Sequence, residues 1–145
     1  MKKVKRISLS FVLAAALFMG TSLAAYAASV NLVVKNEGAV VFSGDIPLPE
    51  DGTININDTE GNPHPANARS VLSVVNDADQ TTGDFSISSL IYYSSFNAFY
   101  LKCMTVAEGG ELCDNWQYKV DGDDPGVGMD NKTLSGDEDV VLFFG

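Results

Sequence analysis

The sequence predicts an α+β domain in which one helix packs on a mostly antiparallel, β-grasp-like sheet. Apolar residues recur at helical spacing in a single segment, residues 66–79, and they alternate at strand spacing over most of residues 30–144. The order of elements is therefore a hairpin, one helix and then several strands. A helix lying across an antiparallel sheet satisfies that order, and the β-grasp arrangement is the simplest such fold.

The first 27 residues have the features of a secretory signal peptide. An apolar run covers residues 7–23, and Ala25-Tyr26-Ala27 fits the small-x-small cleavage rule. The apolar run is short for a membrane span. We therefore expect residues 28–145 to form one secreted or periplasmic domain of a bacterial envelope, with no membrane span left after cleavage. The basic start of this segment comprises Lys2, Lys3, Lys5 and Arg6.

The mature chain is strongly acidic. Loss of residues 1–27 leaves five basic and nineteen acidic residues, a net charge of about −14. Such a field repels nucleic acid and anionic lipid, whose binding rests on Lys and Arg. The charge favours solubility and either cationic partners or calcium. We expect a monomer whose partner is a small molecule or an envelope protein.

Cys103 and Cys113 are predicted to form a structural disulfide. They lie on two predicted strands joined by Ala107-Glu108-Gly109, a three-residue hairpin loop in which Gly109 would take the left-handed conformation. In that register Cys103 lies opposite Cys113, at a separation that suits a disulfide. Two thiols without a histidine nearby make a poor metal site, so we expect no metal here.

The N-terminal half reads as a hairpin, a long loop and the helix. Val30–Lys35 and Val40–Ile46 form the predicted hairpin. A polar connection follows over residues 50–65, with a short strand at residues 53–56. The helix is expected to start near Pro65, which suits a first helical position, and to stop at Gly83.

Strands dominate the remainder of the chain. Residues 85–93 lead into a turn at Ser94–Asn97, and a strand over residues 99–104 follows. The returning strand runs from Leu112 to Val120 and ends at the Asp121-Gly122 turn. A turn at residues 134–137 precedes the last strand, which contains Val140, Leu142 and Phe144.

The segment from Trp116 to Gly122, Trp-Gln-Tyr-Lys-Val-Asp-Gly, carries a family resemblance. With Pro125-Gly126-Val127 and Leu134-Ser135-Gly136-Asp137, it resembles the DUF4430 family, which is similar to the C-terminal β-domain of transcobalamin and intrinsic factor. The resemblance covers roughly residues 30–144. Asp121 departs from the family pattern, in which Asn is commoner.

The resemblance implies a ligand-binding surface and a corrinoid, cobalamin, as its possible ligand. In the vitamin carriers this domain caps cobalamin against a large helical domain, which this chain lacks, so capping would need a partner protein. Good small-molecule sites bury most of the ligand, and a lone cap covers about half. The matching residues are an aromatic platform and a backbone rim, namely Trp116, Gln117, Tyr118, Pro125, Gly126 and Val127.

The residues leave two alternatives open. Trp116 and its strand neighbours could face the core, in which case only the loop of the proposed surface remains. An aromatic-rich segment at residues 92–100 could instead contact a partner protein, which makes a protein-interaction module with no small-molecule ligand the alternative function. Its aromatic members are Tyr92, Tyr93, Phe96, Phe99 and Tyr100.

Catalysis and an EF-hand have little support. His64 is the single histidine and lies between two prolines, and no Gly-x-Ser-x-Gly elbow occurs. Counted from Asp121, the EF-hand pattern fails at Pro125 and Lys132. A looser calcium site among Asp121, Asp123, Asp124 and Asp130, or around Asn57, Asp58 and Glu60, stays open. We expect a non-enzymatic binding module.

Overall fold

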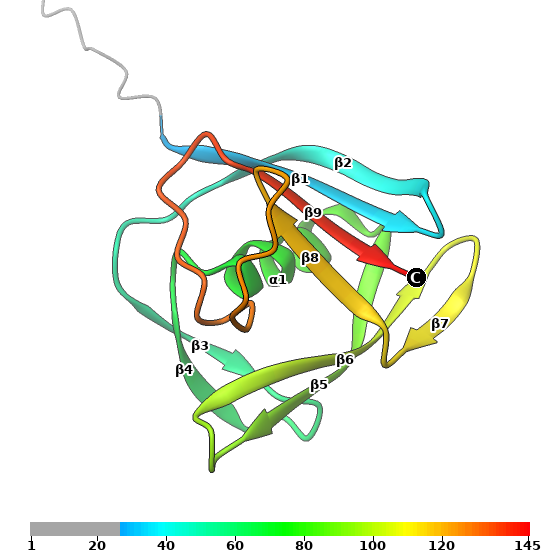
Figure 1. The fold of residues 1–145 in the computed structure, drawn as a ribbon. Helices are drawn as coiled ribbons and strands as arrows, with labels where there is room; N and C mark the ends of the chain where they lie inside the picture. The colour runs from blue at the N-terminus through cyan, green and yellow to red at the C-terminus, as the bar shows by residue number, and fades with distance from the viewer. Residues whose placement is uncertain (1–26) are drawn as a thin grey trace, which may run out of the picture.

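A four-stranded sheet and a single helix form the centre of the computed structural model, which describes residues 27–145 (Figure 1). The strands lie in the order β2 (Ala39–Pro47), β1 (Ser29–Asn36), β9 (Asp139–Phe144) and β8 (Trp116–Val120). Strands β1 and β9 are parallel, and both outer pairs are antiparallel. This order with one helix in the crossover is the β-grasp arrangement, so the predicted α+β class is confirmed.

Helix α1 (Val71–Thr82) begins later than predicted. Ser70 is its N-cap, and the Ser70 side chain accepts a hydrogen bond from the Ser73 backbone N–H at 3.1 Å. This cap determines the start in place of Pro65, which lies in a strand instead. The predicted end is confirmed, because Gly83 has φ +76° directly after the last turn.

The apolar face of α1 fills the space under the four-stranded sheet. Its buried side chains meet those of β1 and β9, which point to the same side of the sheet, and together they make the core. The helix residues are Val71, Leu72, Val74, Val75 and Ala78, and the strand residues are Val30, Leu32, Val34, Val140 and Leu142.

The expected long polar connection is a hairpin. Strand β3 (Thr53–Asn57) confirms the predicted short strand, and β4 (Pro63–Asn67) pairs with it. Neither Pro63 nor Pro65 can donate a hydrogen bond to a neighbouring strand. In a two-stranded sheet β4 has a free edge, and prolines are tolerated there.

A second antiparallel sheet contains β5 (Phe85–Tyr93), β6 (Ala98–Val106) and β7 (Gly110–Cys113). The predicted register between β6 and β7 is confirmed, since Cys103 pairs with Cys113 and the two form a disulfide with a Cα–Cα distance of 4.1 Å. The left-handed residue of the loop is Gly110 (φ +68°) rather than Gly109. Gly109 has a different reason to lack a side chain, because a Cβ there would lie 2.9 Å from Cγ2 of the buried Val106 and 2.7 Å from Asn36 Nδ2.

The predicted strand from Leu112 to Val120 is broken in two. Asp114 has φ +68°, and its N–H donates to the carbonyl of Lys102 at 2.8 Å. Beyond this point the chain leaves the β5–β6–β7 sheet, and β8 joins the four-stranded sheet. The break thus places Trp116 and the strand after it beside β9.

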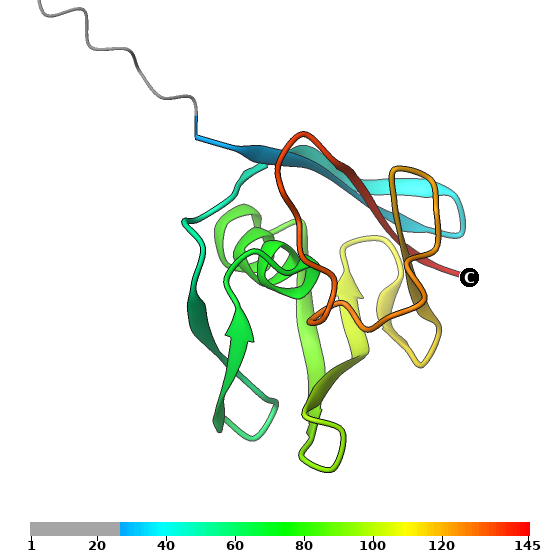
Figure 2. The ribbon, with the colours of Figure 1, turned by 60° about the vertical axis from the view of Figure 1, so that its left-hand side comes forward.

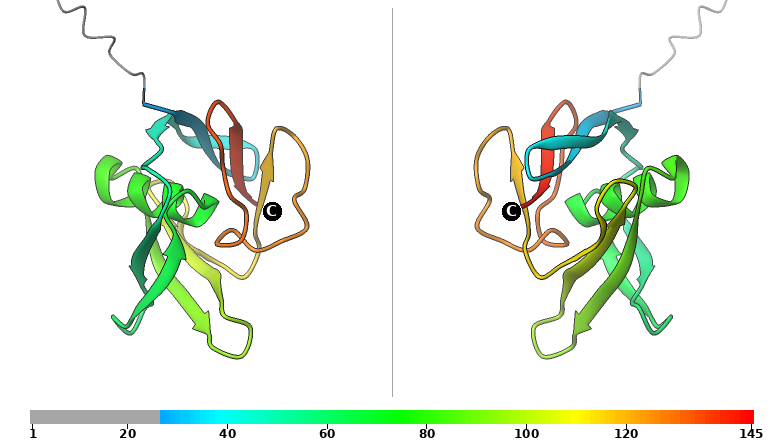
Figure 3. Two further views of the ribbon diagram at one scale, coloured as in Figure 1. Left: turned by 90° about the vertical axis from the view of Figure 1, so that its left-hand side faces the viewer. Right: turned by 90° about the vertical axis from the view of Figure 1, so that its right-hand side faces the viewer.

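The two β-hairpins project away from the four-stranded sheet. Viewed from the side, the sheet lies on one side of α1, and the β3–β4 and β5–β6 hairpins extend on the other (Figure 2 and Figure 3). The β5–β6 turn is therefore a tip that stands clear of the sheet. The predicted signal peptide lies outside the described residues except for Ala27, and within residues 27–145 no helix has the length and apolarity needed to cross a membrane.

Candidate functional site

Trp116 lies on the inner side of the four-stranded sheet and is half-buried. Its ring packs 5.3 Å from that of Phe144, and its Nε1–H donates to the carbonyl of Leu112 at 2.9 Å. Exposure alternates along β8, so Tyr118 shares the inner side whereas Gln117 is exposed on the outer side. The indole therefore packs against the core, and its polar atom has an internal partner.

Tyr118 holds the loop that follows β8. Its hydroxyl donates to the carbonyl of Val127 at 2.7 Å. Burial raises the pKa of Tyr118 to about 12, and the nearby negative charges of Asp124 and Asp130 add to the rise. The phenol thus stays neutral and keeps donating this hydrogen bond over the whole physiological range.

The loop after β8 forms an exposed rim beside this anchored tyrosine. Pro125 is half-buried, Gly126 is exposed, and Val127 is 49% exposed. The structure therefore brings the inward aromatic residues next to the 125–127 rim but leaves Gln117 on the opposite face. The six residues predicted as a ligand surface do not form one continuous exposed platform.

The second aromatic cluster divides into an inner and an outer part. Tyr92 and Phe99 point inward and pack 5.0 Å apart. We call the outer part, Tyr93, Phe96 and Tyr100, the aromatic tip; these side chains are 45%, 79% and 38% exposed. The Tyr93 ring lies 6.5 Å from those of both other members, so the three form one patch on the β5–β6 hairpin.

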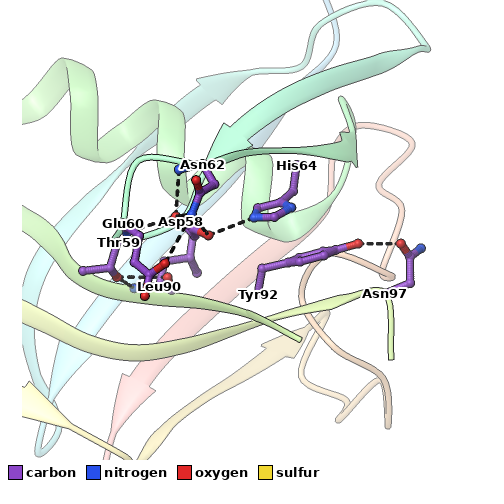
Figure 4. Close-up of polar contacts among 8 residues, drawn as sticks. All are labelled: Asp58, Thr59, Glu60, Asn62, His64, Leu90, Tyr92 and Asn97. Atoms are coloured by element: carbon purple, nitrogen blue, oxygen red, sulfur yellow. Dashed lines mark hydrogen bonds and ion pairs between the residues drawn. The ribbon is translucent and has the colours of Figure 1, made fainter. Parts of the chain in front are cut away.

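His64 braces the inner side of this hairpin. Its ring stacks on that of Tyr92 with centroids 3.8 Å apart, and its Nε2 lies 2.8 Å from Asp58 Oδ2 (Figure 4). Sequence reasoning missed this role because two flanking prolines made His64 look like a loop residue. Recognising the alternation of β4 would have placed the His64 side chain on its inner face.

Thr59 fastens the β3–β4 hairpin to β5. Its hydroxyl donates to the carbonyl of Leu90 at 2.9 Å and accepts from the Leu90 N–H at 2.7 Å, while its own N–H donates to the same carbonyl (Figure 4). Thr59 thus satisfies both the N–H and the carbonyl of Leu90, as a neighbouring strand would. With the His64–Tyr92 stack, this contact holds the two hairpins together behind the aromatic tip.

Asp58 is expected to make the fold sensitive to acid. The hydrogen bond with His64 is the main cause that lowers the Asp58 pKa to about 2. Burial opposes this decrease, and hydrogen bonds from Asn62 and Glu60 add to it. The pKa of Asp58 is thus lower in the folded state than the 3.8 of the unfolded chain, so the ionised carboxylate stabilises the fold. This contribution is complete above pH 3.8 and is lost as the pH falls through about 2. In thermal unfolding at each pH, the stability advantage of the protein over Asp58→Asn should shrink between pH 4 and 2. An advantage independent of pH would contradict this.

Within residues 27–145, no three carboxylate groups converge as closely as the ligands of one metal ion would. The Asp58 carboxylate already accepts from the backbone N–H groups of Glu60 and Asn62, from the Asn62 amide and from His64. The one metal-like grouping found there is Cys103, Glu111 and Cys113, whose sulfurs are joined in the disulfide and so offer no thiolate. The loose calcium sites considered from the sequence gain no support from this geometry.

A shallow polar cleft of about 380 Å³ lies beside the turn of the β5–β6 hairpin. Asn97, in the turn of the β5–β6 hairpin, forms part of its wall, as does Asp130, which accepts a hydrogen bond from the Phe99 N–H at 2.9 Å. The cleft continues over β3, β4 and the 130–133 loop. The cleft thus presents carboxamide, carboxylate and hydroxyl groups, and the β5–β6 turn forms part of its wall.

No protein-family model matches this chain, and comparison with curated proteins and with solved structures finds no match either.

Proposed function

We propose that this protein is a secreted, non-enzymatic binding module whose aromatic tip docks on a partner protein of the bacterial envelope. The observation that carries the proposal is the exposure of Tyr93, Phe96 and Tyr100 together at the end of a projecting hairpin. Aromatic side chains are enriched at the centres of protein interfaces, and contiguous exposed apolar patches mark interaction sites.

The bracing behind the tip favours tight docking. The inner neighbours Tyr92 and Phe99 are packed, and Thr59 and His64 tie this hairpin to β3 and β4. A surface that is already ordered loses less conformational entropy on binding, which raises affinity for the same contacts.

Binding of labelled protein to envelope preparations of the producing bacterium tests the proposal. Tyr93→Ser/Phe96→Ser should weaken binding about tenfold or more, because truncating central aromatic residues removes most of an interface's energy. The matched control is Val40→Ser/Val127→Ser, which removes two other exposed apolar side chains, 58% and 49% exposed, far from the tip in sequence. Equal losses in both double variants, or no loss in either, would contradict docking through the tip.

A second candidate, capping of a small molecule or a corrinoid together with a partner, rests on the family resemblance. The structural observation that favours it is the exposed 125–127 rim, which Tyr118 holds in place. Titrating cobalamin while following the fluorescence of Trp116, the single tryptophan, should then give a saturable change, and Tyr93→Ser/Phe96→Ser should leave that change intact. An unchanged signal up to millimolar cobalamin would end this candidate for the isolated chain.

A further inference from the structure

The outer face of the four-stranded sheet carries a cationic and apolar surface. Opposite the buried side, the register places Lys35 of β1, Phe143 of β9 and Gln117 of β8 in one row. The adjacent row contains Val33, Val141 and Lys119. The two lysines therefore flank an apolar centre diagonally.

Lys35 and Lys119 have no ion-pair partner within residues 27–145. The ion pairs found there are His64–Asp58 and Arg69–Asp51. Lys102 and Lys132 are not in these ion pairs either, and what distinguishes Lys35 and Lys119 is their place on either side of β9 on this apolar face. Their charge is thus available to a partner.

The two ends of this face differ in charge. Asp45 of β2 and Asp139 of β9 both pair with Asn31 of β1 and are exposed, so they form an acidic row. Asn31 lies four residues before Lys35 on β1, about 13 Å away at the rise of a strand. A charged partner would therefore bind in one orientation, with its acidic groups towards the lysines.

A groove of about 370 Å³ runs between the lysines. Val141 and Phe143 supply its apolar wall, and Lys35 and Lys119 lie at its border. The apolar wall of the groove suits one or two apolar side chains of a ligand, and the lysines at its border suit carboxylates on either side of them. It is on the opposite side of the sheet from α1 and does not include the aromatic tip.

We propose that this outer face docks an acidic peptide segment of a partner protein, with carboxylates on Lys35 and Lys119 and an apolar side chain on Phe143. The negative charge of the whole molecule does not prevent this, since charges are screened beyond about 8 Å at physiological ionic strength. A lipid surface is a poorer match, because a flat anionic membrane would also approach Asp45 and Asp139.

The test uses a fluorescein-labelled peptide of alternating Glu and Leu residues with one central Phe, and the same peptide with Gln in place of Glu. Fluorescence anisotropy should show saturable binding of the acidic peptide only. Lys35→Glu/Lys119→Glu should weaken it about tenfold or more, with a further loss in high salt for the unmodified protein. The control Lys102→Glu/Lys132→Glu changes the net charge equally and should bind as the unmodified protein does.

Several outcomes would overturn this proposal. They are no binding of the acidic peptide at millimolar protein, equal weakening in both lysine pairs, or equal binding of the Gln peptide. Binding to anionic phospholipid vesicles, or a dimer in sedimentation, that depends on Lys35 and Lys119 while the peptide does not bind would assign the face to lipid or to a second copy instead. Tyr93→Ser/Phe96→Ser should not affect the peptide, which separates this surface from the aromatic tip.

Discussion

Reduction of the Cys103–Cys113 disulfide is expected to lower the free energy of unfolding by about 3 kcal/mol. The bond closes a short loop, with a sequence separation of 10, and its loss releases the unfolded chain from that constraint. Urea denaturation with and without reductant, followed by circular dichroism, measures the difference. A loss below about 1 kcal/mol would contradict this effect on the unfolded chain.

The Cys103→Ala/Cys113→Ala variant is the matched control for reagent effects. It should show the same loss in the absence of reductant and no further loss in its presence. Trp116 fluorescence should also change on reduction, since the indole donates to the carbonyl of Leu112, the residue directly before Cys113. An unperturbed indole would show that Leu112 keeps its position without the bond.

Leu72→Ala is expected to destabilise the fold by about 3 kcal/mol. Leu72 is 0% exposed and lies in the face of α1 that fills the space under the sheet, so truncation leaves a cavity. Thermal or urea unfolding gives the value. Gln80→Ala, an exposed position of the same helix, should change stability by less than about 0.5 kcal/mol. Similar losses for the two variants would contradict the assignment of the buried face.

Most of the fold follows from local patterns that the sequence displays. The alternation of residues 30–35 and 40–46, the Gly83 stop and the pairing of Cys103 with Cys113 were predictable because each depends on neighbouring residues. The parallel pairing of β1 with β9 joins residues more than a hundred positions apart, and only the fold analogy could suggest it.

The predictions of the helix start and of a continuous strand from Leu112 to Val120 were wrong because a nearby residue favoured another conformation. Pro65 suits a helix start as well as an edge strand, and the Ser70 cap decided between them. The positive φ of Asp114, a residue that tolerates this conformation, divided a strand that looked continuous. Both features affect the candidate site. The later helix start leaves residues 63–67 free to form β4, which carries His64, and the break at Asp114 places Trp116 in the four-stranded sheet.

The candidate surfaces were less predictable than the fold. The sequence indicated aromatic residues at 92–100 and 116–118, but alternation alone did not say which side each strand would bury. In the structure Tyr92 and Tyr93 face opposite sides of their sheet, as do Gln117 and Tyr118, and this determines which of these side chains are free to bind. Strand order and sheet packing, which are non-local, determine it.

The most direct test of the proposed function compares two variants in the same envelope-binding and unfolding measurements. Tyr93→Ser/Phe96→Ser should lose binding about tenfold or more and keep its unfolding free energy within about 0.5 kcal/mol. Trp116→Phe should keep binding and lose about 1 kcal/mol, because it removes the hydrogen bond to the Leu112 carbonyl. Circular dichroism follows unfolding in both. Full binding by the tip variant, with binding lost in Trp116→Phe, would contradict the account and place the functional surface at β8.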